Sequence, residues 1–180
     1  VTGVDVTSEN AADILDDGKV SYVPDTKTLT LNNAVLNSGI YRSSRVDGDD
    51  LTVNLIGENT IDITDTYGIS LGANALFLQG GGTLKIIETG DMGQQGIWAK
   101  KVTIDGITLS INSGSSCIYA EANYGVAVED GDETVNIVNG AELTLVSSQS
   151  AAISAKEISI NGSTVTATTN DDSHHALYAW

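Results

Sequence analysis

Six segments of the chain repeat the same order of short patterns, and this repetition constrains the fold more than any other feature. Each segment has an alternating apolar run, a turn rich in Gly or Asn, a second alternating run and a polar loop. Each then closes with a small residue followed by Ile or Leu. The closing tetrads are GIYR (39–42), GISL (68–71), GIWA (96–99), CIYA (117–120), AISA (152–155) and ALYA (176–179). Self-similarity at a spacing of about 20 to 50 residues predicts a solenoid.

Three strand-like segments per repeat predict an all-β fold, namely a single-stranded right-handed parallel β-helix of about six coils. In such a fold each coil lies on the next at a spacing of about 4.8 Å. Left-handed β-helices use a strict hexapeptide rhythm, which this chain lacks. A β-sandwich also has many short strands, but it would not explain why six segments share one order. The apolar residues that anchor the first strands are Leu31, Leu55, Leu78, Ile104, Ile137 and Ile160.

The first 26 residues differ from the repeats and predict an N-terminal cap. A solenoid without a cap would expose its core and the edge of its terminal strands. Residues 8–15 combine an N-cap residue with an acidic first turn, which predicts a short helix. Residues 20–23 and 28–31 alternate on either side of a turn, which predicts a hairpin. We therefore expect one domain, with the cap over 1–26 and the β-helix over 27–180.

The charge balance restricts the partners of the protein. The chain has 8 basic and 24 acidic residues, which gives a net charge of −16. This field repels nucleic acids and anionic membranes, and no apolar run approaches the length of about 18 residues that spans a bilayer. We expect neither a nucleic-acid partner nor membrane insertion. Because the chain opens at Val1 rather than at Met, we expect either a removed targeting segment or a piece of a longer protein.

The closing tetrads predict an outward column that is rich in aromatic residues. If the Ile or Leu of each tetrad points inward, the next residue points outward. These outward residues are Tyr41, Ser70, Trp98, Tyr119, Ser154 and Tyr178. Tyr and Trp rings offer an apolar face with a polar edge, which suits stacking on sugars, and Gln94 and Gln95 precede the column as hydrogen-bonding groups. Strand propensity or packing against a partner explains the same aromatic residues without a ligand.

A second outward column is expected just ahead of the second strands. Its members are Thr60, Thr83, Thr108, Glu142 and Thr164. A regular threonine array would suit ice binding, but Glu142 interrupts the column and strand propensity explains the threonines.

Three acidic turns contain the oxygen donors that calcium requires: 16–18, 47–50 and 129–133. Glycine permits the bent backbone that such a site needs. Solvated acidic turns that bind no cofactor are the default interpretation; if one of the three binds calcium, we expect it to be the turn of Asp47, Asp49 and Asp50.

The chain lacks the residue sets of known catalytic solenoids. Glycoside hydrolases gather carboxylates on one face, whereas the outward positions of the first strands contain none here. The two arginines, Arg42 and Arg45, lie near one loop. Cys117 occupies the small-residue position of its tetrad, which indicates packing rather than nucleophilic chemistry. We therefore assign no catalytic residue.

The opening of the chain resembles repeat-bearing modules of secreted or cell-wall proteins of gut Firmicutes. The resemblance rests on VDVTS (4–8), NAADIL (10–15), DGKVSY (17–22) and PDTKTLTLNNA (24–34). The coils resemble right-handed β-helix domains of the pectate-lyase-like and carbohydrate-binding kind. The resemblance implies a secreted or cell-surface location and glycan binding, and it transfers no active site.

These observations lead to three functional hypotheses. The first is a non-catalytic extracellular module that binds polysaccharide or host glycan along Tyr41, Trp98, Tyr119 and Tyr178. The second is a structural stalk or adhesin segment of a larger surface protein, in which the column packs against a neighbouring domain. The third is a calcium-dependent polysaccharide lyase.

Overall fold

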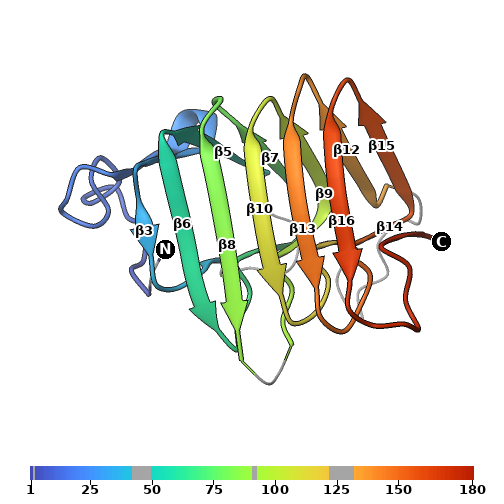
Figure 1. Cartoon of the computed structure of the whole chain (residues 1–180). Coiled ribbons are helices and arrows are strands. Elements are labelled where there is room, and N and C mark those ends of the chain that lie inside the picture. Colours follow the sequence, from blue (N-terminus) through green and yellow to red (C-terminus); the bar gives the residue numbers. More distant parts are fainter. Residues whose placement is uncertain (2, 42–49, 91–92, 122–131) are drawn as a thin grey trace.

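The computed structural model describes residues 1, 3–41, 50–90, 93–121 and 132–180. They form an all-β parallel solenoid of about five turns, which confirms the predicted fold class. In Figure 1 the chain advances from left to right while the strands of the near face descend, so the coil is right-handed. No helix in the described residues is long and apolar enough to span a bilayer.

Three faces surround the core, and each face has one strand from every repeat; strands at the same level form a rung. The closing tetrads form the first face, in β4 (Ile40–Tyr41), the start of β7 (Ile69–Gln79), the start of β9 (Ile97–Asp105), β11 (Ile118–Ala120), β14 (Ile153–Ala155) and β17 (Leu177–Ala179). The second face contains β2 (Thr28–Asn32), β5 (Leu51–Ile56), the ends of β7 and β9, β12 (Thr134–Val138) and β15 (Glu157–Asn161). The third face contains β3 (Val35–Leu36), β6 (Glu58–Thr64), β8 (Thr83–Thr89), β10 (Thr108–Ser113), β13 (Glu142–Ser147) and β16 (Thr164–Thr169).

The interior consists of columns of aliphatic side chains, because alternate residues of each strand point inward. One column runs through the second face, and its members are Leu29, Val53, Leu78, Ile104, Ile137 and Ile160. The first five of these side chains are at most 2% exposed. Such stacking removes apolar surface from water at every level, so each rung stabilises its neighbours.

The register differs by two residues from the alignment that the sequence suggested at one step only, from β5 to β7, and agrees with it at the other four steps. We expected Leu31 and Leu55 to stack on Leu78, but Leu29 and Val53 occupy those places. The threonine column is displaced in the same way, because Thr83 lies opposite Glu58 rather than opposite Thr60. A shift of two keeps every side chain on its own face, so the apolar pattern alone could not detect it.

The N-terminal cap contains the predicted hairpin but not the predicted helix. Strand β1 (Val20–Val23) pairs with β2 in antiparallel fashion, across a 3-10 turn at Pro24–Thr26. Residues 8–15 form turns, and no strand forms over 1–6 in the described residues.

Local hydrogen bonds explain why no helix forms. Asn10 Oδ1 accepts the backbone N–H of Thr7 at 2.8 Å, and Asp13 Oδ1 accepts that of Gly18 at 3.0 Å. Short polar side chains that bond to nearby backbone in this way compete with helix formation. Ala11 and Ile14 also bond to the β1 backbone and are buried against the core.

The last rung differs from the others because its inward side chains are open to solvent. Ile160 of β15 is 43% exposed and Leu177 of β17 is 42% exposed, whereas their counterparts in the preceding rung, Ile137 and Ile153, are fully buried. Strands β15, β16 and β17 are therefore outer strands of the solenoid, visible at the red end of Figure 1.

Candidate functional site

The closing tetrads align in the structure as their sequences suggested. Ile40, Ile69, Ile97, Ile118, Ile153 and Leu177 stack in one inward column. The neighbouring positions therefore also stack, and they hold Tyr41, Ser70, Trp98, Tyr119, Ser154 and Tyr178. The four aromatic residues of the predicted column thus lie on one face of the solenoid.

The accessibility of these rings is uneven, which corrects the expectation of a uniformly exposed column. Tyr41 and Tyr178 are 42% and 48% exposed, but Trp98 is only 8% exposed. The Tyr67 ring lies beside the Trp98 ring at a centroid distance of 5.3 Å. The Trp98 indole N–H donates to the backbone oxygen of Glu121 at 3.3 Å. Trp98 is therefore a packed part of this surface rather than an open stacking platform.

Two rings from outside the predicted column extend it. The Tyr41 hydroxyl donates to the Tyr67 backbone oxygen at 2.8 Å and bonds to the Thr66 hydroxyl, so Tyr41 and Tyr67 are neighbours. At the other end, the Trp180 ring lies 6.4 Å from that of Tyr119 and 6.1 Å from that of Tyr178. We call the whole set the aromatic band: Tyr41, Tyr67, Trp98, Tyr119, Tyr178 and Trp180.

The most open part of the band is the cluster of Tyr119, Tyr178 and Trp180. Tyr178 and Trp180 are each 48% exposed, and Tyr119 is partly exposed. Ser154 lies between Tyr119 and Tyr178 in the register and is only 6% exposed, because larger side chains surround its small one. Sequence reasoning did not assign Trp180 to this surface, and it counted Tyr67 among the polar loop residues before the column rather than among its rings. Two sequence positions could have indicated that these rings join the band. Tyr67 directly precedes its tetrad, and Trp180 follows Tyr178 by two residues.

The polar residues near the band are held by the turns that precede the tetrads. Gln94 and Gln95 are partly buried in the turn before β9. Their backbone oxygens accept N–H groups of Ser115 and Gly68 at 3.2 and 3.4 Å, which ties neighbouring rungs together. In the last turn, the Asp171 carboxylate accepts hydrogen bonds from Ser173 and lies 2.8 Å from His174 Nδ1. These hydrogen bonds, from Ser173 first and then from His174, lower the pKa of Asp171 to about 2.

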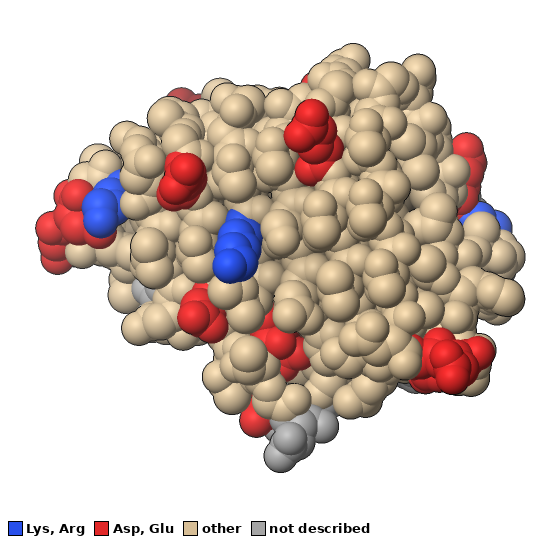
Figure 2. Space-filling model, viewed as in Figure 1, with Lys and Arg blue, Asp and Glu red and all other residues tan. Residues whose placement is uncertain are grey.

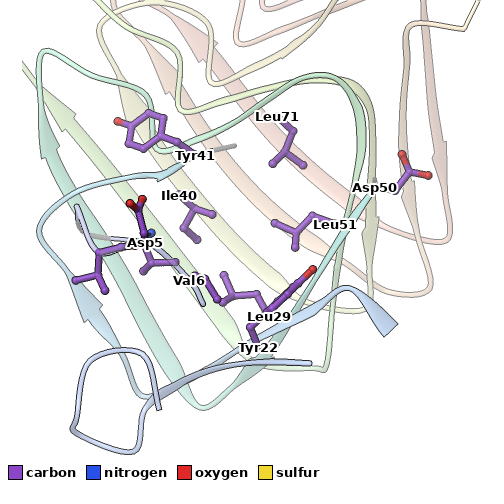
Figure 3. Close-up of a pocket in the computed structure, with 11 residues that line it drawn as sticks. Asp5, Val6, Tyr22, Leu29, Ile40, Tyr41, Asp50, Leu51 and Leu71 are labelled. Carbon is purple, nitrogen blue, oxygen red and sulfur yellow. Dashed lines mark hydrogen bonds between the residues drawn. The ribbon is translucent and has the colours of Figure 1, made fainter. Parts of the chain in front are cut away.

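The predicted calcium turn is only partly within the described residues. Asp47 and Asp49 lie outside them, and Asp50 Oδ1 accepts the backbone N–H of Ala75 at 2.9 Å. This bond connects two rungs, which gives Asp50 a structural role. Asp50 and Tyr41 also line a cavity of about 480 Å³ between the N-terminal segment and the first rung, where Asp5 faces the same space (Figure 3).

Cys117 is fully buried, as the small-residue position predicted. Its thiol lies 3.6 Å from the Ser113 hydroxyl. Burial raises the pKa of this thiol to about 11, so it is neutral at physiological pH and unsuited to act as a nucleophile.

The outer side of the third face is only sparsely charged, although the whole protein is strongly acidic. Figure 2 views this face, and isolated charged side chains stand among uncharged ones. Threonine, serine and asparagine occupy many of its outward positions. The register places Thr108 and Thr164 on either side of Glu142, so the threonines form no unbroken array.

Comparisons with known proteins add no family to this description. No family model, no curated protein and no solved structure matched the chain. Function must therefore be argued from the geometry of the chain itself.

Proposed function

We propose that the protein is a non-catalytic, extracellular module that binds polysaccharide or host glycan along the aromatic band. The observation that carries the proposal is the open cluster of Tyr119, Tyr178 and Trp180 at one end of a continuous series of rings. Aromatic rings bury sugar faces at low conformational cost. Beyond the packed Trp98, Tyr67 and the 42% exposed Tyr41 extend the same face along the solenoid axis, which suits a linear polymer.

Charge supports a neutral ligand. At a net charge of −16 the protein repels polyanions, so a neutral glycan fits better than an acidic one. Side chains in the turns before the tetrads, including Gln94, Gln95 and Gln149, offer hydrogen bonds that suit sugar hydroxyls.

The test is a binding measurement on a panel of neutral polysaccharides and oligosaccharides, by affinity electrophoresis and titration calorimetry. The test variant replaces Tyr178 and Trp180 with Ala. The matched control is Phe77→Ala, because Phe77 is 39% exposed but lies on the second face. Trp98 is a poor probe, since its packed indole would cost stability when removed.

We expect the double variant to lose roughly tenfold or more in affinity, since each stacked ring contributes about 0.5–1.5 kcal/mol beyond the area that it buries. The control should bind as the wild type does. Equal affinities of the double variant and the wild type, or no binding by the wild type to any glycan of the panel, would refute the proposal.

A structural role in a larger surface protein is the second candidate, and the open last rung favours it. Exposed inward residues such as Ile160 and Leu177 are suited to burial against another rung or domain. Amide hydrogen exchange of β15, β16 and β17 tests this role. Exchange in these strands should slow when a further rung or domain is joined to this end of the chain, and equal exchange rates would count against the structural role.

A further inference from the structure

The connection between β11 and β12 is a long loop, and the two residues at its ends, Glu121 and Glu133, adjoin the same corner of the solenoid. In the third rung, only Lys100 separates the tetrad residue Ala99 from Lys101 of the second face. In the fourth rung, the chain leaves this corner at Glu121 and returns at Glu133. Ala120 pairs with Ala99, and Thr134 pairs with Lys101. Glu121 and Glu133 therefore both stack on the position of Lys100, one coil further along, at the two stems of the loop.

Each of these two glutamates has a buried carboxylate oxygen without a hydrogen-bond partner. The atoms are Glu121 Oε2 and Glu133 Oε2. Glu133 is only 8% exposed. It precedes the fully buried Val135 and Ile137 by two and four residues, so it lies on the same side of the chain as these inward-facing residues. Burying a carboxylate without a partner is costly, and a cation bound between these two oxygens would offset that cost.

The nearby lysines do not supply this charge by direct contact. Lys101 Nζ pairs with Asp132 Oδ2 at 3.0 Å. Lys100 and Lys156 hold the same corner in the third and fifth rungs, yet within the described part of the chain neither forms an ion pair with Glu121 or Glu133. The backbone of Glu133 is itself engaged, since its oxygen accepts the N–H groups of Lys156 and Glu157. Both carboxylate oxygens are thus buried with no hydrogen-bond partner.

We propose that Glu121 and Glu133 bind a divalent cation, with Ca²⁺ the best match, and that the cation fastens the two stems of the loop. Calcium takes six to eight oxygen ligands in flexible geometry, and the donors at this corner are oxygens. Across the described ranges, no group of three or more His, Cys, Asp and Glu side chains gathers at one point. The site therefore uses two carboxylates, completed by carbonyl and water oxygens.

The proposed site touches the aromatic band but does not depend on glycan binding. Glu121 accepts the indole N–H of Trp98 through its backbone oxygen. A cation that fixes Glu121 will alter the surroundings of that indole. Trp98 and Trp180 are the two tryptophans of the chain, so a Trp180→Phe background leaves Trp98 as a fluorescent reporter beside the site.

The experiment titrates CaCl₂ into chelator-treated full chain in the Trp180→Phe background, at physiological salt, and follows Trp98 fluorescence and Tm. At 100 times Kd we expect Tm to rise by about 5 to 10 °C. Glu133→Gln and Glu121→Gln should each abolish the rise and the fluorescence change. Glu142→Gln is the matched control, because Glu142 is an exposed carboxylate on the third face, and it should respond as the wild type does.

A measurement without calcium separates ligand binding from a purely structural role. If Glu133 serves a cation, the amide removes an unpartnered charge, so Glu133→Gln in chelator should have a Tm equal to or above that of the wild type. A lower Tm in chelator together with an unchanged calcium response would overturn the proposal. So would the absence of any response of the wild type at about 10 mM Ca²⁺. Equal responses of Glu133→Gln and Glu142→Gln would show general screening of the negative charge instead, and would overturn it too.

Discussion

Shortening the same side chain at different levels of one core column tests the solenoid model most directly. The column contains Ile104, Ile137 and Ile160 in consecutive rungs. The first two are fully buried, and Ile160 is 43% exposed. Ile→Ala at each position removes the same three carbons, so any difference in cost arises from the surroundings.

The magnitudes follow from burial. Removing three buried carbons costs about 2.4 kcal/mol in transfer free energy at about 0.8 kcal/mol each. The cavity left between two neighbouring rungs raises the total to about 3 to 4 kcal/mol for Ile104→Ala and Ile137→Ala. Ile160 has no covering rung and buries little more than half of its surface, so Ile160→Ala should cost about 1 to 1.5 kcal/mol.

The assay is equilibrium unfolding in guanidinium chloride, with the free energy of unfolding compared among the three variants and the wild type. Two spectroscopic probes should be used, because repeat proteins can lose two-state behaviour. If Ile160→Ala costs as much as Ile104→Ala, the last rung is covered in solution and our description of an open end is wrong.

Two further predictions concern titrating groups. The pKa of Asp171 is lowered to about 2, below the value of about 3.9 in unfolded chains. Its hydrogen bonds therefore stabilise the fold above about pH 4, and this contribution is lost as the pH falls from about 4 to 2. Asp171→Asn should remove that part of the acid dependence in unfolding curves, and an Asp171 carboxyl that titrates near 4 by NMR would contradict the geometry. Burial raises the pKa of Cys117 to about 11, so its contribution to stability is complete below about pH 8.5 and is lost as the pH rises towards 11. A thiol reagent at pH 8 should react with the native protein far more slowly than with the denatured protein, and similar rates would argue against a buried thiol.

The sequence predicted the architecture well because the repeats carry redundant information. Six tetrads place an aliphatic residue after a small one, and the structure stacks those aliphatic residues in one column. Because one side of each strand is buried, alternate residues must face the core, and a shift by one residue would expose all of them. The hairpin of β1 and β2 was predictable for the same reason, since alternation on both sides of a turn leaves few other pairings.

Other features were not predictable because they depend on contacts between distant residues. The helix expected over 8–15 is absent because Asn10 and Asp13 bond to local backbone while Ala11 and Ile14 pack on the first rung. The burial of Trp98 depends on Tyr67, which belongs to another repeat.

The sequence by itself determined the period of the coil, the three strands per turn and the side of each strand that faces the core. Alternation and turn residues are local properties, and they suffice for these features. The tertiary structure decided the register of β7 on β5 and of β8 on β6, which rings of the aromatic band are open, and which carboxylates are buried without partners. A shift by two residues preserves the alternation, so only the stacking of whole rungs selects between registers. Exposure likewise depends on which neighbours arrive from other repeats, as Tyr67 does at Trp98 and Trp180 does at Tyr119.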